Sequence, residues 1–338
     1  MADTWRAGGH EPLRDPRISA VIVTHNRKRS LGIVLDRLQQ HPVDEVIVFD
    51  NGSTDGTAEY VESRGDARVR VLRSDSNIGL GGHNEAARAA SGDLLLWLDD
   101  DAYPLEGAVE TLRDVFLDHP DLAVAGGFVI DVDPTGAVLR QVEVGTFDWF
   151  FRGGRNQPVP REGIPSFFFP EGACMVRREA FLAAGGYFAP FFFTVCEVDL
   201  TTRLVAQRWD VRYVPAARFE HMKVTEGRTD PGRVLHMRVR NQIWYFCRHF
   251  PTVMAARRIA AYLLFDLVEC AYRGSTKEWA RAIAEAFRRR DVLADSRHPL
   301  DRVSLRRAEM HRGRLHVRLL SAQLLRRLSG AAKIGGAA

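Results

Sequence analysis

The chain has 338 residues, of which 46% are hydrophobic and 27% are charged. This composition is typical of globular proteins with a full core, and it excludes disordered, collagen-like and disulfide-scaffold classes. The four cysteines form no Cys-x-x-Cys pair, and the chain shows neither a signal-peptide run nor an apolar run of about 18 residues. We therefore expect a cytoplasmic protein that is neither secreted nor inserted in a membrane.

Charge is distributed unevenly along the chain. The net charge is +4, but residues 1–235 carry a net −9 and residues 236–338 a net +13. The second part is thus a basic module. Charge alone leaves open whether it meets nucleic acid, anionic lipid or a phosphorylated ligand, or is a solvated face.

Short β-branched runs alternate with amphipathic segments from residue 18 onward. The pattern predicts strands at 18–24, 45–50, 69–72 and 94–98, and helices at 31–38, 54–63 and 82–90. This alternation indicates an α/β fold with a mostly parallel sheet flanked by helices. Ligands bind beyond the carboxyl ends of the strands in such sheets, and polar residues follow three of these strands.

Later segments change character. Residues 124–193 are typical of strands and loops, whereas apolar spacing predicts helices at 233–249, 251–272, 277–290 and 305–328.

Three adjacent carboxylates, Asp99, Asp100 and Asp101, follow the strand 94–98. They repel one another, and alternation along extended backbone points Asp99 and Asp101 to the same side. A hard divalent ion, Mg²⁺ or Mn²⁺, would neutralise the cluster and leave coordination positions for substrate phosphates. The alternative is an N-cap and turn for a helix that starts near Pro104, although a cap needs only one aspartate.

The segment 50–57 follows a strand and opens a helix. It fits either a turn with a helix cap or a site at which Asp50 accepts hydrogen bonds from a base or ribose. The absence of GxGxxG after the first strand argues against a dinucleotide-binding fold, and the absence of GxxxxGK[ST] excludes a P-loop.

Four motifs at 21–27, 50–57, 77–84 and 98–101 occur in an order and spacing that resemble family 2 glycosyltransferases of the GT-A fold, in the rhamnosyltransferase and galactofuranosyltransferase-like branch. The resemblance covers about residues 18–250 and continues through 171–179, 185–188, 197–200 and 214–215 with His221. Members of that family are inverting enzymes that use nucleotide-sugar donors. The resemblance therefore implies this chemistry here, with rhamnosyl or galactofuranosyl transfer in cell-envelope polysaccharide or glycolipid assembly.

The resemblance also assigns roles to individual residues. The metal-binding set would be Asp99, Asp101 and His221. The nucleotide-sugar site would comprise Thr24, Asn26, Arg27, Asp50, Ser53, Asn77, Gly79, Asp99 and Asp100. Asp199, Arg240 and Asn241 would close over the donor or acceptor, with a solvated face as the other interpretation of the last two.

Inversion requires a base that takes the proton from the acceptor hydroxyl. The family usually has a Glu-Asp pair before Val-Asp-Leu, but this chain has Cys196 and Glu197 there. Glu197 is therefore the candidate base, although the first acid is missing. The alternative is that Glu197 is only a favourable charge at a helix N-terminus.

The implied organisation is an N-terminal extension (1–17), a catalytic domain (18–235) with a nucleotide-binding half (18–123) and an acceptor half (124–235), a basic helical extension (236–330) and a frayed tail (331–338). Expected partners are a UDP- or dTDP-sugar, a glycan or lipid-linked acceptor, an anionic membrane surface on the inner face of the cell membrane, and a second copy of the chain, but not nucleic acid. A secondary-metabolite acceptor, a nucleotidyltransferase and a non-catalytic glycan-binding scaffold stay open as alternatives.

Overall fold

The computed structural model describes residues 10–133, 135–142, 160–224, 229–272, 274–294 and 296–306. They divide into two compact units, one that ends at Arg228 and one that begins at Thr229. This division falls before the boundary expected after residue 235, because the first helix of the second unit already begins at Pro231. Nearly all of the helix expected at 305–328, and the tail 331–338, lie outside the described residues.

The first unit is built from a sheet with helices on both faces. Its helices are α1 (Lys28–Leu38), α2 (Thr57–Ser63), α3 (Gly81–Ala89), α4 (Ala108–Asp118), α5 (Arg178–Ala183) and α6 (Cys196–Ala206), with a 3₁₀ turn η2 at Ala189–Phe191. Its strands are β1 (Ile18–Thr24), β2 (Glu45–Asp50), β3 (Val69–Arg73), β4 (Leu94–Asp99), β5 (Ala102–Pro104), β6 (Leu122–Val132), β7 (Val138–Val142), β8 (Ile164–Pro165), β9 (Ala173–Arg177) and β10 (Asp210–Met222).

The described strands pair in the order β3-β2-β1-β4-β9-β6-β10-β5, with β7 added to β6 and β8 to β10. Strands β3, β2, β1 and β4 are parallel, as the alternation of strands and helices predicts. Beyond β4 the sheet is mixed, since β9 runs antiparallel to both β4 and β6. Antiparallel pairs need no crossover helix, so the strand–helix alternation that predicts a parallel sheet ends where this part begins.

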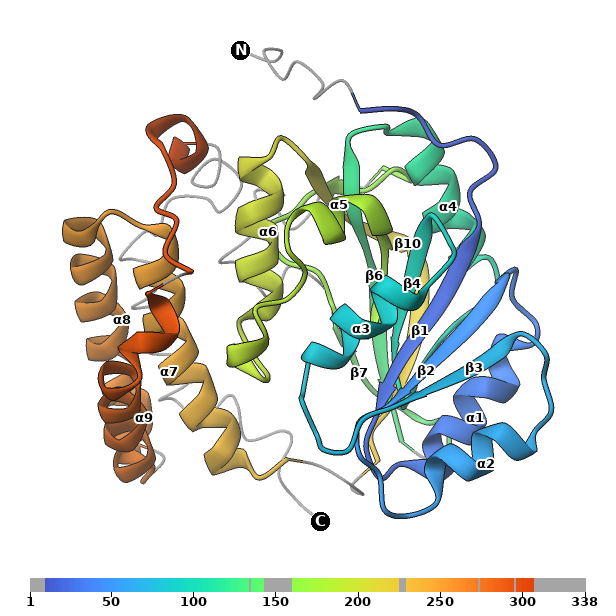
Figure 1. The fold of residues 1–338 in the computed structure, drawn as a ribbon, viewed down its shortest axis with the longest axis horizontal. Helices are drawn as coiled ribbons and strands as arrows, with labels where there is room; N and C mark the ends of the chain where they lie inside the picture. Colours follow the sequence, from blue (N-terminus) through green and yellow to red (C-terminus); the bar gives the residue numbers. More distant parts are fainter. Residues whose placement is uncertain are drawn as a thin grey trace. The chain divides into compact units, whose positions relative to one another are not determined.

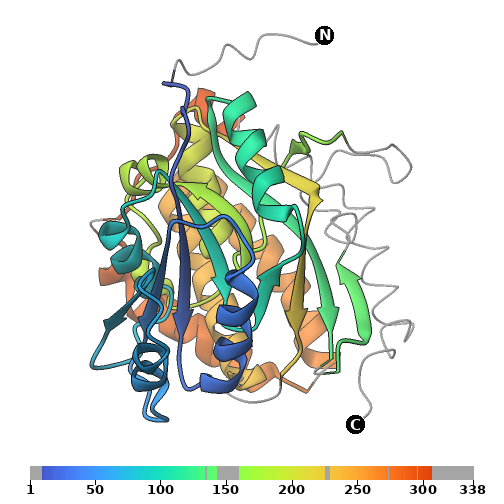
Figure 2. The ribbon, with the colours of Figure 1, turned by 90° about the vertical axis from the view of Figure 1, so that its right-hand side faces the viewer.

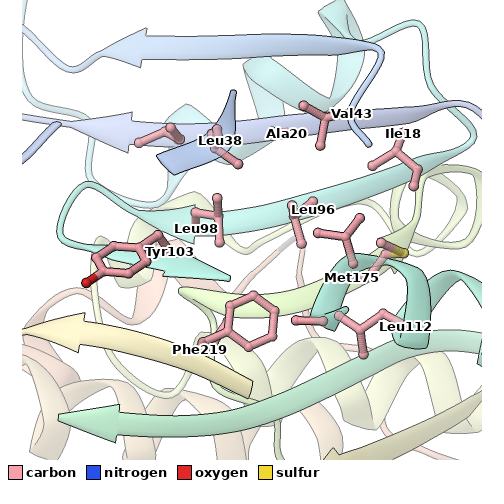
Figure 3. Close-up of a cluster of buried hydrophobic side chains, with 14 of the residues drawn as sticks. Ile18, Ala20, Leu38, Val43, Leu96, Leu98, Tyr103, Leu112, Met175 and Phe219 are labelled. Carbon is pink, nitrogen blue, oxygen red and sulfur yellow. The ribbon is translucent and has the colours of Figure 1, made fainter. Parts of the chain in front are cut away.

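Helices α1, α2 and α4 cover one face of the sheet, and α3, α5 and α6 cover the other (Figures 1 and 2). The first face holds a large hydrophobic cluster, in which Leu96 and Leu98 of β4 pack with Ile18, Leu38 and Leu112 (Figure 3). Side chains alternate along a strand, so Trp97 and Asp99 point to the opposite face. This alternation directs Asp99 toward the side of α3, α5 and α6.

One expected element is wrong. The helix predicted to begin near Pro104 begins at Ala108, and residues 102–104 form the short strand β5 instead. Strand β5 pairs with β10 and places Ala102 opposite His221. The triple aspartate therefore leads into a strand and does not cap a helix.

The second unit consists of α7 (Pro231–His249), α8 (Thr252–Tyr272), α9 (Thr276–Arg288) and the 3₁₀ turn η3 (Arg290–Leu293). Glu285 of α9 accepts from Arg240 of α7 at 2.7 Å, and Trp244 Nε1 donates to the Ala286 carbonyl at 3.0 Å. Among the described helices, none is both long and apolar enough to cross a membrane. Contact of this basic unit with an anionic membrane stays a prediction.

Candidate functional site

Polar residues gather where β1 and β4 end, at the carboxyl edge of the parallel strands. The two strands are paired so that Val23 lies opposite Asp99, which places Thr24 and Asp100 side by side just beyond. Thr24 Oγ1 donates to Asp100 Oδ2 at 2.8 Å. This edge is the location that the sequence predicts for the ligand site.

The structure brings together the three residues predicted to bind a metal. Oxygen atoms of Asp99 and Asp101 and a ring nitrogen of His221 all lie within 4.8 Å of one another. His221 arrives from β10, whose pairing with β5 sets it next to Asp101, with Nε2 and Oδ1 3.2 Å apart. Two carboxylates and an imidazole suit Mn²⁺ or Mg²⁺, and the exposed Asp99 leaves that side open.

Gly172 forms a cradle for the Asp99 carboxylate. A Cβ added at Gly172 would lie 2.2 Å from Asp99 Oδ2, far inside van der Waals contact. We expect Gly172→Ala to displace Asp99 and weaken Mn²⁺ binding by at least about 10-fold, as the loss of an orienting contact does elsewhere. Isothermal titration calorimetry with Mn²⁺ measures this effect.

Gly81→Ala is the matched control, because its added Cβ would meet other atoms only at 3.5 Å or more. Alanine there should leave Mn²⁺ affinity as in the unsubstituted chain. Equal affinities for the two alanine variants would contradict the role given to Gly172.

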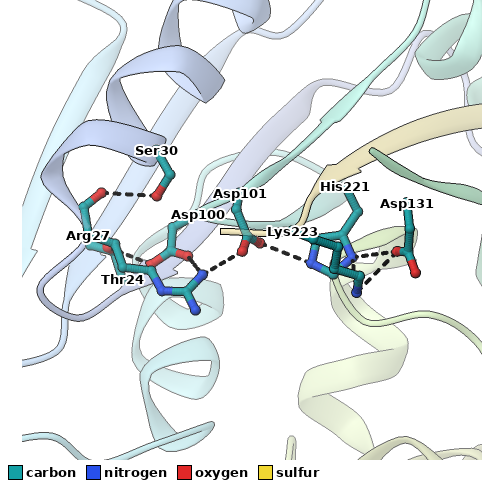
Figure 4. Close-up of polar contacts among 8 residues, drawn as sticks. All are labelled: Thr24, Arg27, Ser30, Asp100, Asp101, Asp131, His221 and Lys223. Carbon is teal, nitrogen blue, oxygen red and sulfur yellow. Dashed lines mark hydrogen bonds and ion pairs between the residues drawn. The ribbon is translucent and has the colours of Figure 1, made fainter. Parts of the chain in front are cut away.

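Arg27 supplies positive charge to the acidic cluster (Figure 4). Its Nη1 lies 2.5 Å from Asp101 Oδ2 and 3.1 Å from Asp100 Oδ1. Burial raises the pKa of Asp100 to about 7, despite the opposing charge of Arg27. The resemblance assigns Arg27 and Asp100 to the nucleotide-sugar site, whereas the contacts described for both side chains lie within this cluster.

Asp131 and Lys223 extend the cluster and were not anticipated from the sequence. Asp131 lies on β6 directly opposite His221, and its Oδ1 is 3.0 Å from His221 Nδ1 and 3.1 Å from Lys223 Nζ. Burial lowers the pKa of His221, but hydrogen bonds to Asp101 and Asp131 outweigh it and bring that pKa to about 9. Asp131 therefore orients the imidazole, and an acid near the end of an apolar strand was the available signal.

The residues predicted to surround the nucleotide form a network of loops. Asn26, with a φ of 55°, donates from its backbone N–H to Ser53 Oγ at 2.9 Å and accepts at its side chain from Thr54 N at 2.7 Å. Ser53 N in turn donates to Asp50 Oδ1 at 2.9 Å. These side chains hold the loops after β1 and β2 together.

The loop after β3 is hydrogen-bonded to the loop after β2 and packs closely against the segment before α6. Asn51 Nδ2 donates to the Gly79 carbonyl at 3.0 Å, and Asn77 Oδ1 accepts from Gly79 N at 2.9 Å. Gly79 has a φ of 59°, and a Cβ there would lie 2.2 Å from the Phe192 carbonyl oxygen. The tight approach requires glycine, and it joins this loop to the chain that carries Glu197.

Glu197 lies in the first turn of α6, and the residues that lead into this helix have a strained backbone. Phe192, Thr194 and Val195 all have φ near 65°, a conformation that β-branched residues rarely adopt. Burial, followed by the negative charge of Asp99, raises the pKa of Glu197 to about 7. A carboxyl with that pKa can accept a proton near neutral pH.

The three residues expected to close over the ligand are engaged elsewhere. Asp199 is fully buried and its Oδ2 lies 2.7 Å from Arg203 Nη2, one turn further along α6. Arg240 pairs with Glu285, and its Nε donates to Asn241 Oδ1 at 3.0 Å inside the helical unit. A closing role for these residues stays a prediction.

Glu171 is a second acid of this site that was missed. It precedes Gly172, the residue that cradles Asp99, and the charge of Glu197 acts on it. The resemblance includes the segment 171–179 but assigns no role to Glu171, because its place beside Asp99 depends on the pairing of β9 with β4.

Part of the chain matches a known protein family. Residues 19–183 match the family model described as "Glycosyl transferase family 2". A protein of Mycobacterium tuberculosis named N-acetylglucosaminyl-diphospho-decaprenol L-rhamnosyltransferase is 28% identical over 222 residues, which cover 57% of this chain and 70% of that protein.

Two solved structures share the fold. GalNAc-T7 with UDP, GalNAc and Mn²⁺ has a TM-score of 0.55 at 16% identity, over 70% of this chain and 48% of that one. The mannosyltransferase PcManGT of Pyrobaculum calidifontis, in complex with GDP-Man and Mn²⁺, has a TM-score of 0.53 at 16% identity, over 96% and 90% of the two chains. The GT-A fold expected from the sequence is thereby confirmed.

Proposed function

Since this chain belongs to glycosyl transferase family 2 through residues 19–183, we propose that it transfers a sugar, with inversion, from a nucleoside diphosphate sugar to a hydroxyl acceptor in a metal-dependent reaction. The observation that carries the proposal is the convergence of Asp99, Asp101 and His221 on one point, with Glu197 on the same side of the sheet. An acidic metal site and a nearby half-buried base are the two parts that such a transfer needs.

The donor would lie against the loops after β1, β2 and β3. Asp50 and the loop held by Asn26 and Ser53 offer acceptors and backbone donors for a base and ribose. Asp99, Asp101 and His221 would hold the divalent ion, which supplies positive charge to the leaving diphosphate. The Mn²⁺ named with the two solved structures supports an ion of this class.

Glu197 would act on the acceptor. Inversion requires the acceptor oxygen to attack from the face opposite the leaving diphosphate, and its proton must pass to a base on that face. Burial of Glu197 keeps this carboxylate poorly solvated and raises its basicity. The buried Asp199, paired with Arg203, is positioned to fix α6 and not to take the proton.

For the acceptor we favour a lipid-linked glycan and for the sugar a rhamnosyl group. The support is the relative named as acting on N-acetylglucosaminyl-diphospho-decaprenol, which matches this chain over 70% of its own length. Substrate choice in this fold resides in loops, so this part of the proposal depends on direct assays with candidate donors.

A thermal-shift panel tests the proposal. UDP, dTDP and GDP are added to the full chain with and without Mn²⁺, and one of them should raise the unfolding midpoint only when the metal is present. A ligand at 100 times its Kd stabilises the native state by about 2.7 kcal/mol, which is easily measured.

The control for the panel is Asp118→Asn, on the exposed side of α4, which should keep the shift. Absence of a shift with every nucleotide, or a shift of equal size without metal, would contradict the proposed donor site. Release of free sugar from the matching donor would then separate an active transferase from a non-catalytic scaffold.

A further inference from the structure

Helix α8 of the second unit exposes one side along its whole length. Its inner side packs on α7, where Asp266 is fully buried and its Oδ1 lies 3.0 Å from Arg238 Nη2. The exposed positions recur every three or four residues, so they form one continuous stripe, called here the outer face of α8. The outer face consists of Val253, Ala256, Arg257, Ala260, Ala261, Leu264, Leu267, Val268, Ala271 and Tyr272.

The outer face of α8 is apolar almost without interruption. Val253 is 75% exposed, Leu264 68% and Tyr272 60%, and Arg257 is the single charged residue of the face. Isolated exposed apolar side chains are common on globular proteins, but a row of them along a helix of 21 residues marks a contact surface.

The surroundings of the outer face are basic. The exposed positions of α9, which packs against α8, carry Lys277, Arg281 and Arg288, together with Phe287 at 57% exposure. Among the described side chains of α8 and α9, no exposed position carries an acid. Residues 236–338 have a net charge of +13, so the outer face fits an occupant that is both apolar and negatively charged.

Two other occupants fit these features less well. A second copy of the chain would bring another unit of the same high positive charge against this one, which is unfavourable. A protein partner makes about one hydrogen bond per 100–200 Å² of interface, but the outer face offers polar side-chain groups only on Arg257 and Tyr272. A lipid surface needs no such directional partners.

The helix is suited to lie on a bilayer and not to cross it. Among the described helices, none is long and apolar enough to span a membrane, and the inner side of α8 keeps Asp266 paired within the protein. A helix with an apolar face and basic neighbours lies in the interface, with that face buried at the boundary of headgroups and acyl chains. Tyrosine is favoured at this level, and Tyr272 lies at the end of the outer face.

We propose that the outer face of α8 is the surface by which this protein docks on an anionic lipid bilayer. The apolar side chains enter the acyl boundary, and Arg257 and the positive charge of the second unit attract the anionic headgroups. The proposal goes beyond sugar transfer and does not depend on it, because docking needs neither donor nor acceptor.

Sedimentation with vesicles tests the proposal on the full chain. Vesicles of equal parts phosphatidylcholine and phosphatidylglycerol should bind the chain at least about 10-fold more tightly than vesicles of phosphatidylcholine alone, since each basic residue near the surface adds to the attraction. Leu264→Gln should weaken binding to the anionic vesicles by about 10-fold, because an inserted leucine is lost. The exposure of Leu264 means that the unfolding midpoint should not change.

Leu117→Gln makes the same chemical change at an exposed leucine of α4 in the first unit and is the matched control. It should bind the anionic vesicles as the unsubstituted chain does. Equal binding of the two variants, equal binding to the two kinds of vesicle, or binding to neither would overturn the proposal. Sedimentation velocity without lipid tests the second copy, and a dimer that Leu264→Gln dissociates would also overturn it.

Discussion

Glutamine in place of Glu197 is expected to slow sugar transfer by at least about 10²-fold and to leave nucleotide binding unchanged, because the amide keeps the shape of the side chain but cannot accept the proton of the acceptor hydroxyl. Steady-state kinetics with a radiolabelled donor, together with the thermal shift produced by the nucleotide, separates the two effects. The loss should appear in kcat and not in the donor KM.

The pH dependence of the unsubstituted chain follows from the same group. Burial and the charge of Asp99 raise the pKa of Glu197 to about 7, and only the ionised form accepts a proton. The rate should therefore be full above that pKa and fall as the pH is lowered through it. The expected profile is a single acidic limb near pH 7, measured as kcat against pH.

Glu179→Gln is the control for Glu197→Gln, since it makes the same chemical change at an exposed position on α5. It should keep the full rate. A Glu197→Gln variant that transfers sugar as fast as this control would move the role of base to another residue.

Asparagine at Asp101 is expected to abolish the metal-dependent reaction, with a loss of at least about 10²-fold, because the Asp101 carboxylate belongs to the metal set and also pairs with Arg27. The fold should persist, since Arg27 keeps its contact with Asp100. Chelation of the metal by EDTA should reduce the rate of the unsubstituted chain to the level of the variant, and added Mn²⁺ should restore only the former.

The thermal shift produced by the nucleotide is a second test of Asp101→Asn. Asp101→Asn should lose the metal-dependent rise in midpoint, whereas Asp118→Asn should retain it. Transfer at the usual rate in the presence of EDTA would remove the metal from the reaction altogether.

The first half of the sheet could be predicted from the sequence because its signals are local. Strands such as Ile18–Thr24 and Glu45–Asp50 are short runs rich in β-branched residues, and each is followed by an amphipathic segment. The strand β5 could not be predicted in this way. Three residues carry no periodicity, and its existence depends on pairing with β10, more than a hundred residues later.

The same distinction applies to the site. Asp99 and Asp101 are neighbours in sequence, so their repulsion alone indicated a cation. The resemblance supplied His221, which the β5–β10 pairing then places beside Asp101. Asp131 and Glu171 belong to the site only through strand register, and Val195 adopts a left-handed conformation that its β-branched side chain disfavours. Asp131 has one local signal, an acid near the end of an apolar strand, whereas no composition or spacing rule indicates the role of Glu171 or the backbone of Val195.

Arg27 acts as a built-in counter-ion of the three adjacent aspartates. The guanidinium, held by Asp100 and Asp101, offsets much of the repulsion among three carboxylates before any metal arrives. A protein that carries its own counter-ion does not rely on a tightly held metal to stay folded. Under the proposed function, the divalent ion would therefore serve the reaction and would not be needed to hold the three aspartates together.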